Sequence, residues 1–137
     1  MVKVIQAIVA IIYDKDNFLI LKKKGKWVGW QFVQGGKKKN ESWEDAVKRE
    51  VFEETGLKNV KVIKKLDFKR DYWFVWKGEK IHKFLTFFLV EANKKNKVKI
   101  SVEHSDYKWR KYKKALEDIK YGKDEFKKAV KELKKIK

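Results

Sequence analysis

The chain contains no cysteine and no proline, only three arginines, and no long apolar run. The absence of cysteine excludes disulfides, thiolate metal ligands and a cysteine nucleophile. The apolar stretch over residues 4–13 is shorter than the roughly 18 residues that a membrane span requires. Because this stretch also lacks a signal-peptide cleavage pattern, it predicts a β-strand. We therefore expect a cytoplasmic protein with no membrane partner.

The charge of the chain is strongly one-sided. There are 37 Lys and Arg residues against 19 Asp and Glu residues, which gives a net charge of +18. This balance indicates either a polyanionic partner or a lysine-rich surface of the kind found in many heat-adapted proteins. Arginine is the usual bidentate reader of bases and phosphates. Its restriction to positions 49, 70 and 110 weakens the case for nucleic acid.

The length of 137 residues and the apolar content of 43% predict a single domain, residues 1–137, with one core. Patterning predicts strands over 2–13, 18–21, 30–33, 60–76, 81–92 and 98–102. Helices are predicted over 42–55 and from residue 108 onward, with a break at Tyr121-Gly122. This order indicates a mixed sheet with helices packed on it, in the α/β or α+β class.

The first helix combines an apolar face with carboxylates. Ser42 can cap its N-terminus, and Gly56 can supply a left-handed cap at its end. At helical spacing, Glu50, Glu53 and Glu54 continue the apolar face rather than opposing it. Converging carboxylates repel one another unless a cation joins them, and Mg²⁺ or Mn²⁺ is the natural partner. The alternative is a solvated acidic face neutralised by lysines.

A longer motif surrounds these acids. Its fixed residues are Gly35, Glu41, Arg49-Glu50, Glu53-Glu54 and Gly56, with apolar Val51 and Leu57, over 23 positions. This pattern resembles the signature of the Nudix hydrolases at every fixed position. The resemblance implies an α/β/α sandwich around a mixed sheet. It also implies hydrolysis, with Mg²⁺ or Mn²⁺, of a nucleoside diphosphate linked to another group.

The same resemblance suggests roles for the motif residues. Glu50, Glu53 and Glu54 are expected to be metal ligands, Glu53, Glu54 and Arg49 are expected to be catalytic, and the sequence does not identify which acid is the general base. The spacing allows Arg49 to pair with Glu53 and hold its rotamer. Gly35 is expected to form a tight loop that brings backbone carbonyls near the metal.

Two segments outside the motif indicate a branch of the family. Residues 30–36 resemble a segment shared by asymmetrical dinucleoside-tetraphosphate hydrolases and RNA 5′-pyrophosphohydrolases, although Val33 and Asn40 replace their usual Pro and Gly. The segment from Ser101 to Trp109 is similar to the Ser-x-Glu-His-x-x-Tyr-x-Trp pattern of the first branch. By this resemblance Glu103 is a fourth metal ligand or the base.

A dinucleoside tetraphosphate carries several negative charges and two bases, so its site needs cations and flat aromatic surfaces. We expect the six tryptophans to lie mainly in the core. The candidates for binding phosphate are Lys83, Lys69, Arg70, Lys80 and the basic loop Lys22–Lys26. The candidates for stacking on a base are Phe74, Tyr107 and Tyr72.

Three functions are compatible with the sequence. The favoured one is asymmetrical hydrolysis of dinucleoside tetraphosphates to a nucleoside triphosphate and a monophosphate, by a monomer or weak dimer whose partner is a small molecule. The second applies the same chemistry to RNA 5′ ends or other nucleoside polyphosphates, and brings in nucleic acid as a partner. The third is a non-catalytic nucleic-acid-binding protein, which the retained acidic helix disfavours.

Overall fold

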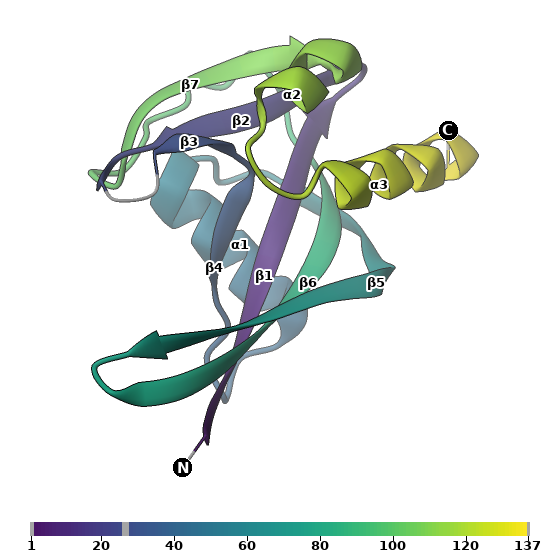
Figure 1. Ribbon diagram of the computed structural model, residues 1–137. Helices are drawn as coiled ribbons and strands as arrows, with labels where there is room; N and C mark the ends of the chain where they lie inside the picture. Colours follow the sequence, from purple (N-terminus) through teal and green to yellow (C-terminus); the bar gives the residue numbers. More distant parts are fainter. Residues whose placement is uncertain (1, 26–27, 137) are drawn as a thin grey trace.

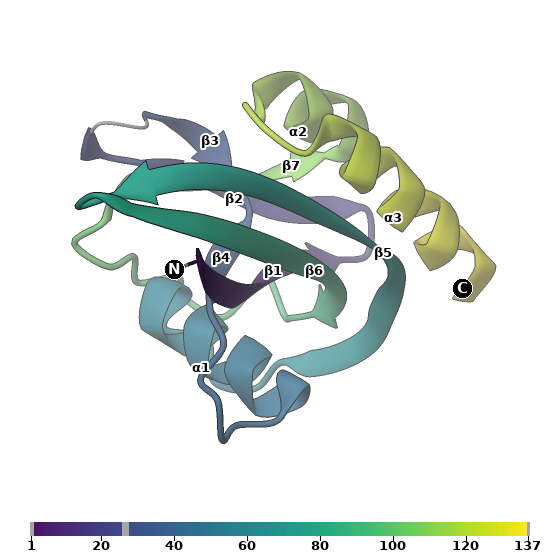
Figure 2. The same ribbon diagram turned by 60° about the horizontal axis from the view of Figure 1, so that its bottom comes forward.

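The computed structural model describes residues 2–25 and 28–136. A sheet of seven strands carries one helix on one face and two on the other (Figures 1 and 2). The elements are β1 (Val2–Asp14), β2 (Asn17–Lys23), β3 (Gly29–Gln31), β4 (Val33–Gly36), α1 (Trp43–Thr55), β5 (Lys61–Trp76), β6 (Glu79–Glu91), β7 (His104–Lys111), α2 (Tyr112–Asp118) and α3 (Lys123–Ile136). This mixed α+β architecture is the one that the sequence predicted.

Strand β1 is the centre of the sheet because it is apolar on both faces. It pairs in parallel with β6 along nearly its whole length, and antiparallel with β2 and β4 on its other side. Successive side chains of a strand point to opposite faces. Ile8, Ala10 and Ile12 therefore pack beneath α1, whereas Val9 and Ile11 belong to the cluster on the other face.

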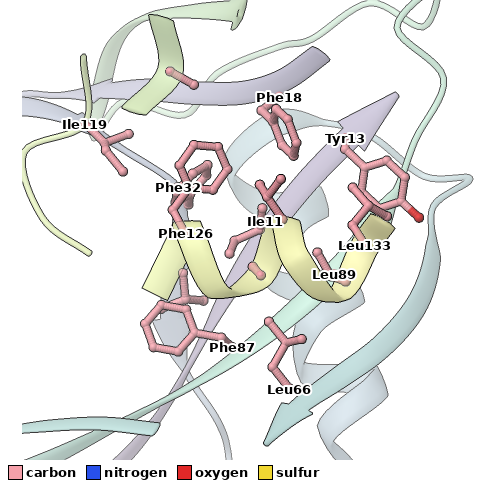
Figure 3. Close-up of a cluster of buried hydrophobic side chains, with 14 of the residues drawn as sticks. Ile11, Tyr13, Phe18, Phe32, Leu66, Phe87, Leu89, Ile119, Phe126 and Leu133 are labelled. Carbon is pink, nitrogen blue, oxygen red and sulfur yellow. The ribbon is translucent and has the colours of Figure 1, made fainter. Parts of the chain in front are cut away.

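That second cluster is closed by α3. Phe126 lies at its centre and contacts Phe18 edge-on, with ring centroids 5.0 Å apart (Figure 3). Leu133 lies further along the same helix face, and Leu89 of β6 belongs to the same cluster (Figure 3). Below, we call the two sides of the sheet the α1 face and the α3 face.

The borders of α1 follow the sequence signals. The Ser42 hydroxyl accepts a hydrogen bond from the Asp45 N–H, and Gly56 ends the helix with φ of 74°. A side chain other than glycine rarely adopts this left-handed conformation. The predicted helix and both of its caps are confirmed.

The C-terminal half differs from the prediction at two places. Residues 98–102 form no strand, and the helix expected from residue 108 begins only at Tyr112. Residues 104–111 instead form β7, which pairs antiparallel with β2 from Asn17↔Lys111 to Lys23↔His104. The pairing partner is some 90 residues away in sequence, so local composition does not reveal it.

The predicted basic loop is also shorter than expected, because Lys22 and Lys23 belong to β2. Lys26 lies outside the described residues. Among the described residues, no helix is long and apolar enough to cross a membrane.

Candidate active site

Arg49 forms hydrogen bonds with several of the acidic residues around helix α1. Its guanidinium donates to both oxygens of Glu41, at 2.9 and 2.7 Å, and to the Glu50 Oε1, at 2.8 Å. It also reaches Glu53 at 3.3 Å and the Gly36 carbonyl at 2.8 Å. The predicted pairing of Arg49 with Glu53 is thus confirmed, but it is one contact among several. The bidentate bond from Arg49, with a smaller contribution from the Lys38 N–H, lowers the pKa of Glu41 to about 2.

Glu50 and Glu54 form a buried carboxyl pair. They are only 8% and 6% exposed, although both are acidic. Burial raises the pKa of Glu54 to about 9, and repulsion by Glu50 and Glu103 adds to the rise. The Gln34 N–H donates to Glu54 and partly offsets this effect. Glu54 therefore carries a proton at neutral pH in the metal-free protein.

Glu53 does not join this pair. Its side chain is 52% exposed and is held by Arg49. Glu53 is nevertheless joined to Glu50 through Arg49, whose Nη1 lies 2.8 Å from Glu50 Oε1 and 3.3 Å from Glu53 Oε2. Glu103, from the loop before β7, lies close enough to raise the pKa of Glu54. Glu54 thus interacts electrostatically with both Glu50 and Glu103.

Gly35 is required for a reason other than the expected one. It lies in extended β4, opposite Ile8 of β1, rather than in a tight loop. A Cβ atom added there would overlap the Glu50 carboxyl group. Gly35 is therefore needed because the Glu50 side chain approaches its backbone closely.

The loop that carries Glu103 is anchored by two polar side chains. The Ser101 hydroxyl accepts from the Glu103 N–H and lies 3.3 Å from His104 Nδ1. The Lys24 N–H donates to the Glu103 carbonyl at 3.0 Å. His104 is buried with its Nε2 3.7 Å from Glu54 Oε1, and burial lowers its pKa. The loop is therefore fixed against the C-terminal part of α1.

The donor atoms at this site fit a divalent cation. Mg²⁺ and Mn²⁺ prefer oxygen ligands, and Glu50, Glu54 and Glu103 would supply three carboxylates. As the side chains stand, no three His, Cys, Asp or Glu residues within 2–25 and 28–136 are gathered closely enough to hold a metal ion. Arg49 occupies part of this donor set, since its Nη1 donates to Glu50 at 2.8 Å and to Glu53 at 3.3 Å. When bound, such a cation neutralises phosphate charge and lowers the pKa of a water molecule.

The raised pKa of Glu54 has a measurable consequence for stability. Between pH 7 and 8.5 the folded, metal-free protein holds a proton that the unfolded chain, with an ordinary glutamate pKa, has lost. Stability therefore decreases as the pH rises through this range. We expect the melting temperature of the metal-free protein to fall from pH 7 to 8.5, and Glu54→Gln to remove most of that fall. An equal fall in the variant would show that Glu54 is already ionised.

Four of the predicted substrate residues share the α3 face of the β5–β6 hairpin. Tyr72 lies opposite Lys83 in the register, and the Lys83 Nζ lies 5.9 Å from the Tyr72 ring centroid. The Phe74 ring is 5.8 Å from that of Tyr72. Arg70 lies on the same face and pairs with Glu125 of α3 at 3.8 Å. A cation and two aromatic rings are thus brought together as expected.

The remaining substrate candidates lie elsewhere. Lys80 and Lys69 alternate onto the α1 face, and Lys80 lies 4.9 Å from the Trp73 ring centroid. Tyr107 pairs with Leu21, whose side chain packs on the α1 side. Lys69, Lys80 and Tyr107 therefore lie on the opposite face of the sheet from Lys83.

Glu41 belongs to the motif, but the sequence alone predicts no role for it. The structure shows that Glu41 fixes the Arg49 guanidinium from outside the carboxyl pair. The spacing of eight residues between Glu41 and Arg49 within the motif was the only sequence feature that could have suggested this contact.

The hydrogen bond from the Gln34 N–H to Glu54 was not predicted either, because every residue except proline has a backbone N–H and the sequence does not show which of them a side chain will meet.

Residues 3–130 match the sequence pattern of the NUDIX domain family. The structure agrees with this match, because the acidic helix α1 packs against β4, which contains Gly35, on a mixed sheet. The chain belongs to the Nudix family and is a Nudix hydrolase, a class of enzymes that generally use divalent metals.

Particular relatives can be named. The chain is 30% identical over 112 residues to an RNA pyrophosphohydrolase of Pelagibacter ubique, covering 72% of this chain and 71% of that protein. An RNA pyrophosphohydrolase of Bartonella henselae is 44% identical over 45 residues, but the match covers only 24% of that protein. Among solved structures, the Caenorhabditis elegans Ap4A hydrolase has a TM-score of 0.76 at 23% identity, with 94% and 97% of the two chains covered. The MutT protein of Methanosarcina mazei has a TM-score of 0.65 at 26% identity, with 96% of each chain covered.

Proposed function

We propose that the protein hydrolyses dinucleoside tetraphosphates asymmetrically, with Mg²⁺ or Mn²⁺ as cofactor. The observation that carries this proposal is the grouping of Lys83, Tyr72 and Phe74 on one face of the β5–β6 hairpin. A cation and two rings match the phosphates and a base of such a substrate. The similarity of residues 101–109 to the asymmetrical hydrolases supports the same assignment.

The acids lie on the α1 face of the sheet. A dinucleotide held by Lys83, Tyr72 and Phe74 on the α3 face would present a phosphate to them at the free edge of β4. Strand β4 pairs with β1 on one side, and the Gln34 N–H points to Glu54 on the other. Glu50 and Glu54 would hold the metal there, close to the Arg49 guanidinium. Glu103 is exposed beside the pair and is the carboxylate best placed to accept a proton from an attacking water.

The product pair tests this proposal. Asymmetrical cleavage of diadenosine tetraphosphate gives ATP and AMP, whereas symmetrical cleavage gives two molecules of ADP. We expect ATP and AMP in equal amounts, and a product only when Mg²⁺ or Mn²⁺ is present. Formation of ADP, or turnover restricted to other substrates in a parallel panel, would contradict the proposal.

A second candidate is the removal of pyrophosphate from RNA 5′ ends. The Pelagibacter ubique relative carries that name at 30% identity, and the net charge of +18 suits a longer polyanion. Release of pyrophosphate from 5′-triphosphorylated RNA, measured beside the dinucleotide assay, separates the two candidates by their relative kcat/KM.

Substitutions on the hairpin test substrate recognition. We expect Lys83→Ala and Phe74→Ala each to weaken transition-state binding by about 1–3 kcal/mol, the range for a charge-assisted contact or one stacked base. The measurement is kcat/KM for the dinucleotide. Lys69→Ala is the matched control on the opposite face, and we expect it to leave kcat/KM within about two-fold. Unchanged kinetics for both hairpin variants would remove this face from the substrate site.

A further inference from the structure

The α1 face of the β5–β6 hairpin carries aromatic surface that the proposed reaction does not use. Trp73 is 50% exposed and stacks on His82, with centroids 3.9 Å apart and planes within 16°. His82 in turn lies 4.1 Å from the Phe84 ring. We call these three residues the Trp73 platform. The expectation that tryptophans lie mainly in the core is wrong at this position.

The platform is held rigidly from below. Asp71 lies 2.6 Å from His82 Nε2, and this contact fixes the orientation of the imidazole beneath the indole. Trp73 and His82 are directly opposite in the strand register. The outer ring of the stack is therefore presented to solvent in a fixed orientation, as base stacking requires.

One lysine contacts the platform, and three more follow a strand on the same sheet. The Lys80 Nζ lies 4.9 Å from the Trp73 ring centroid. Lys37, Lys38 and Lys39 follow β4. The Lys37 N–H donates to the carbonyl of Gln6, which pairs with Phe84 of the platform on its other side. The Lys37 Nζ lies 5.2 Å from the Trp43 ring centroid. Asp71 is occupied by His82. The face thus combines an aromatic plane with the positive charge of Lys80.

We propose that the Trp73 platform and Lys37–Lys39 bind single-stranded RNA, with a base on Trp73 and phosphates along the lysines. A net charge of +18 opposes docking of a second copy of this chain and favours a polyanion. Stacking and lysine contacts are tolerant of sequence, which agrees with the scarcity of arginine. The choice of RNA rests on the second candidate function.

The three lysines also connect the platform to the candidate active site. They follow directly on Gly36, whose carbonyl accepts a bond from Arg49. An RNA chain whose 5′ end lies at Glu50 and Glu54 would pass Lys37–Lys39 before its later bases reach Trp73. The platform would thus add affinity for RNA that a dinucleotide cannot use.

Binding is best measured with an RNA that cannot react. We would use a 12-nucleotide RNA with a 5′-hydroxyl end and a 3′ fluorophore, in EDTA at 150 mM salt, and follow anisotropy. We expect Trp73→Ala to weaken binding at least about five-fold and Trp73→Phe to keep it within about two-fold, because phenylalanine still stacks. Circular dichroism and melting temperature establish that each variant is folded.

Two matched controls separate the platform from general charge and exposed aromatics. Trp76→Ala removes an exposed indole from the other face of the same hairpin, and we expect binding within about two-fold of wild type. Lys38→Gln with Lys39→Gln should weaken binding and flatten its salt dependence. Lys131→Gln with Lys134→Gln removes equal charge from α3 and should have less than about a two-fold effect.

Several outcomes would overturn the proposal. These are no RNA binding by the wild type, equal binding by wild type and Trp73→Ala, or tighter binding of DNA of the same sequence. Self-association that Trp73→Ala abolishes would assign the face to a second copy instead. Because the probe lacks a 5′ phosphate, these results do not depend on whether the dinucleotide is hydrolysed. We expect Trp73→Ala to leave dinucleotide kcat/KM unchanged.

Discussion

Glu54→Gln is expected to lower turnover by at least about 100-fold while the fold remains intact. Glu54 is one of the two buried carboxylates on α1 that would bind the cation, and removal of a charged ligand from a metal site costs activity on this scale. The amide replaces a carboxyl that already carries a proton in the metal-free protein, where its pKa is about 9. The variant should therefore fold at least as stably as the wild type.

The same substitution on an exposed position of α1 is the control for this result. Glu44 lies in the first turn and pairs with Lys48 at 3.3 Å. An exposed pair of this kind contributes little to stability, so Glu44→Gln should retain full turnover. Near-normal Mg²⁺-dependent activity of Glu54→Gln, at an unchanged melting temperature, would remove Glu54 from the active site.

Helix α1 could be predicted from the sequence because its information is local. The cap residues Ser42 and Gly56 lie at its ends, and its apolar residues recur at helical spacing. Strand β1 could also be predicted, because a short, continuous apolar segment is typical of a strand that is buried on both faces. Both elements occupy the predicted residues, apart from one additional residue at the end of β1.

Strand β7 could not be predicted in this way. Its residues 104–111 are rich in lysine and aromatic side chains, and this composition is compatible with a helix. It becomes a strand because β2 offers hydrogen-bonding groups from Asn17 to Lys23. A pairing between segments so distant in sequence depends on the tertiary fold rather than on local propensity.

In the candidate site, too, local features could be predicted from the sequence and tertiary contacts could not. The motif located the acids, but spacing alone suggested that Glu50, Glu53 and Glu54 act together. The structure buries Glu50 and Glu54 but leaves the Glu53 side chain half-exposed, joined to Glu50 through Arg49. Side-chain partners of this kind depend on rotamers, which the sequence does not specify.

Strand periodicity would have corrected the expectation about the hairpin lysines. Lys80 and Lys83 are three positions apart, so within one strand they must point to opposite faces. Their partners agree, since Lys80 lies over Trp73 and Lys83 over Tyr72. The division gives the hairpin one face for the proposed dinucleotide substrate and another for the proposed RNA platform.

Gly35→Ala is expected to reduce kcat by roughly 100-fold, the cost of displacing a catalytic group by about 1 Å. The added methyl group would overlap the Glu50 carboxyl. Glu50 must then move away from Glu54, and its bond with Arg49 is disturbed as well. Because the backbone at Gly35 is extended and pairs with Ile8, alanine causes no conformational strain there. The effect should therefore appear in kcat and in Mg²⁺ affinity, with little change in melting temperature.

Gly36→Ala is the matched control for this prediction. Gly36 is the next residue of β4, and a Cβ atom added to it meets nothing within 4 Å. We expect Gly36→Ala to retain kcat within about three-fold, because the Gly36 carbonyl that binds Arg49 is unaffected by a methyl group on the open side. Equal losses in the two variants would mean that β4 tolerates no side chain at all. Full activity of Gly35→Ala would show that Glu50 has room to move, and that its contact with the Gly35 backbone does not determine the geometry of the carboxyl pair.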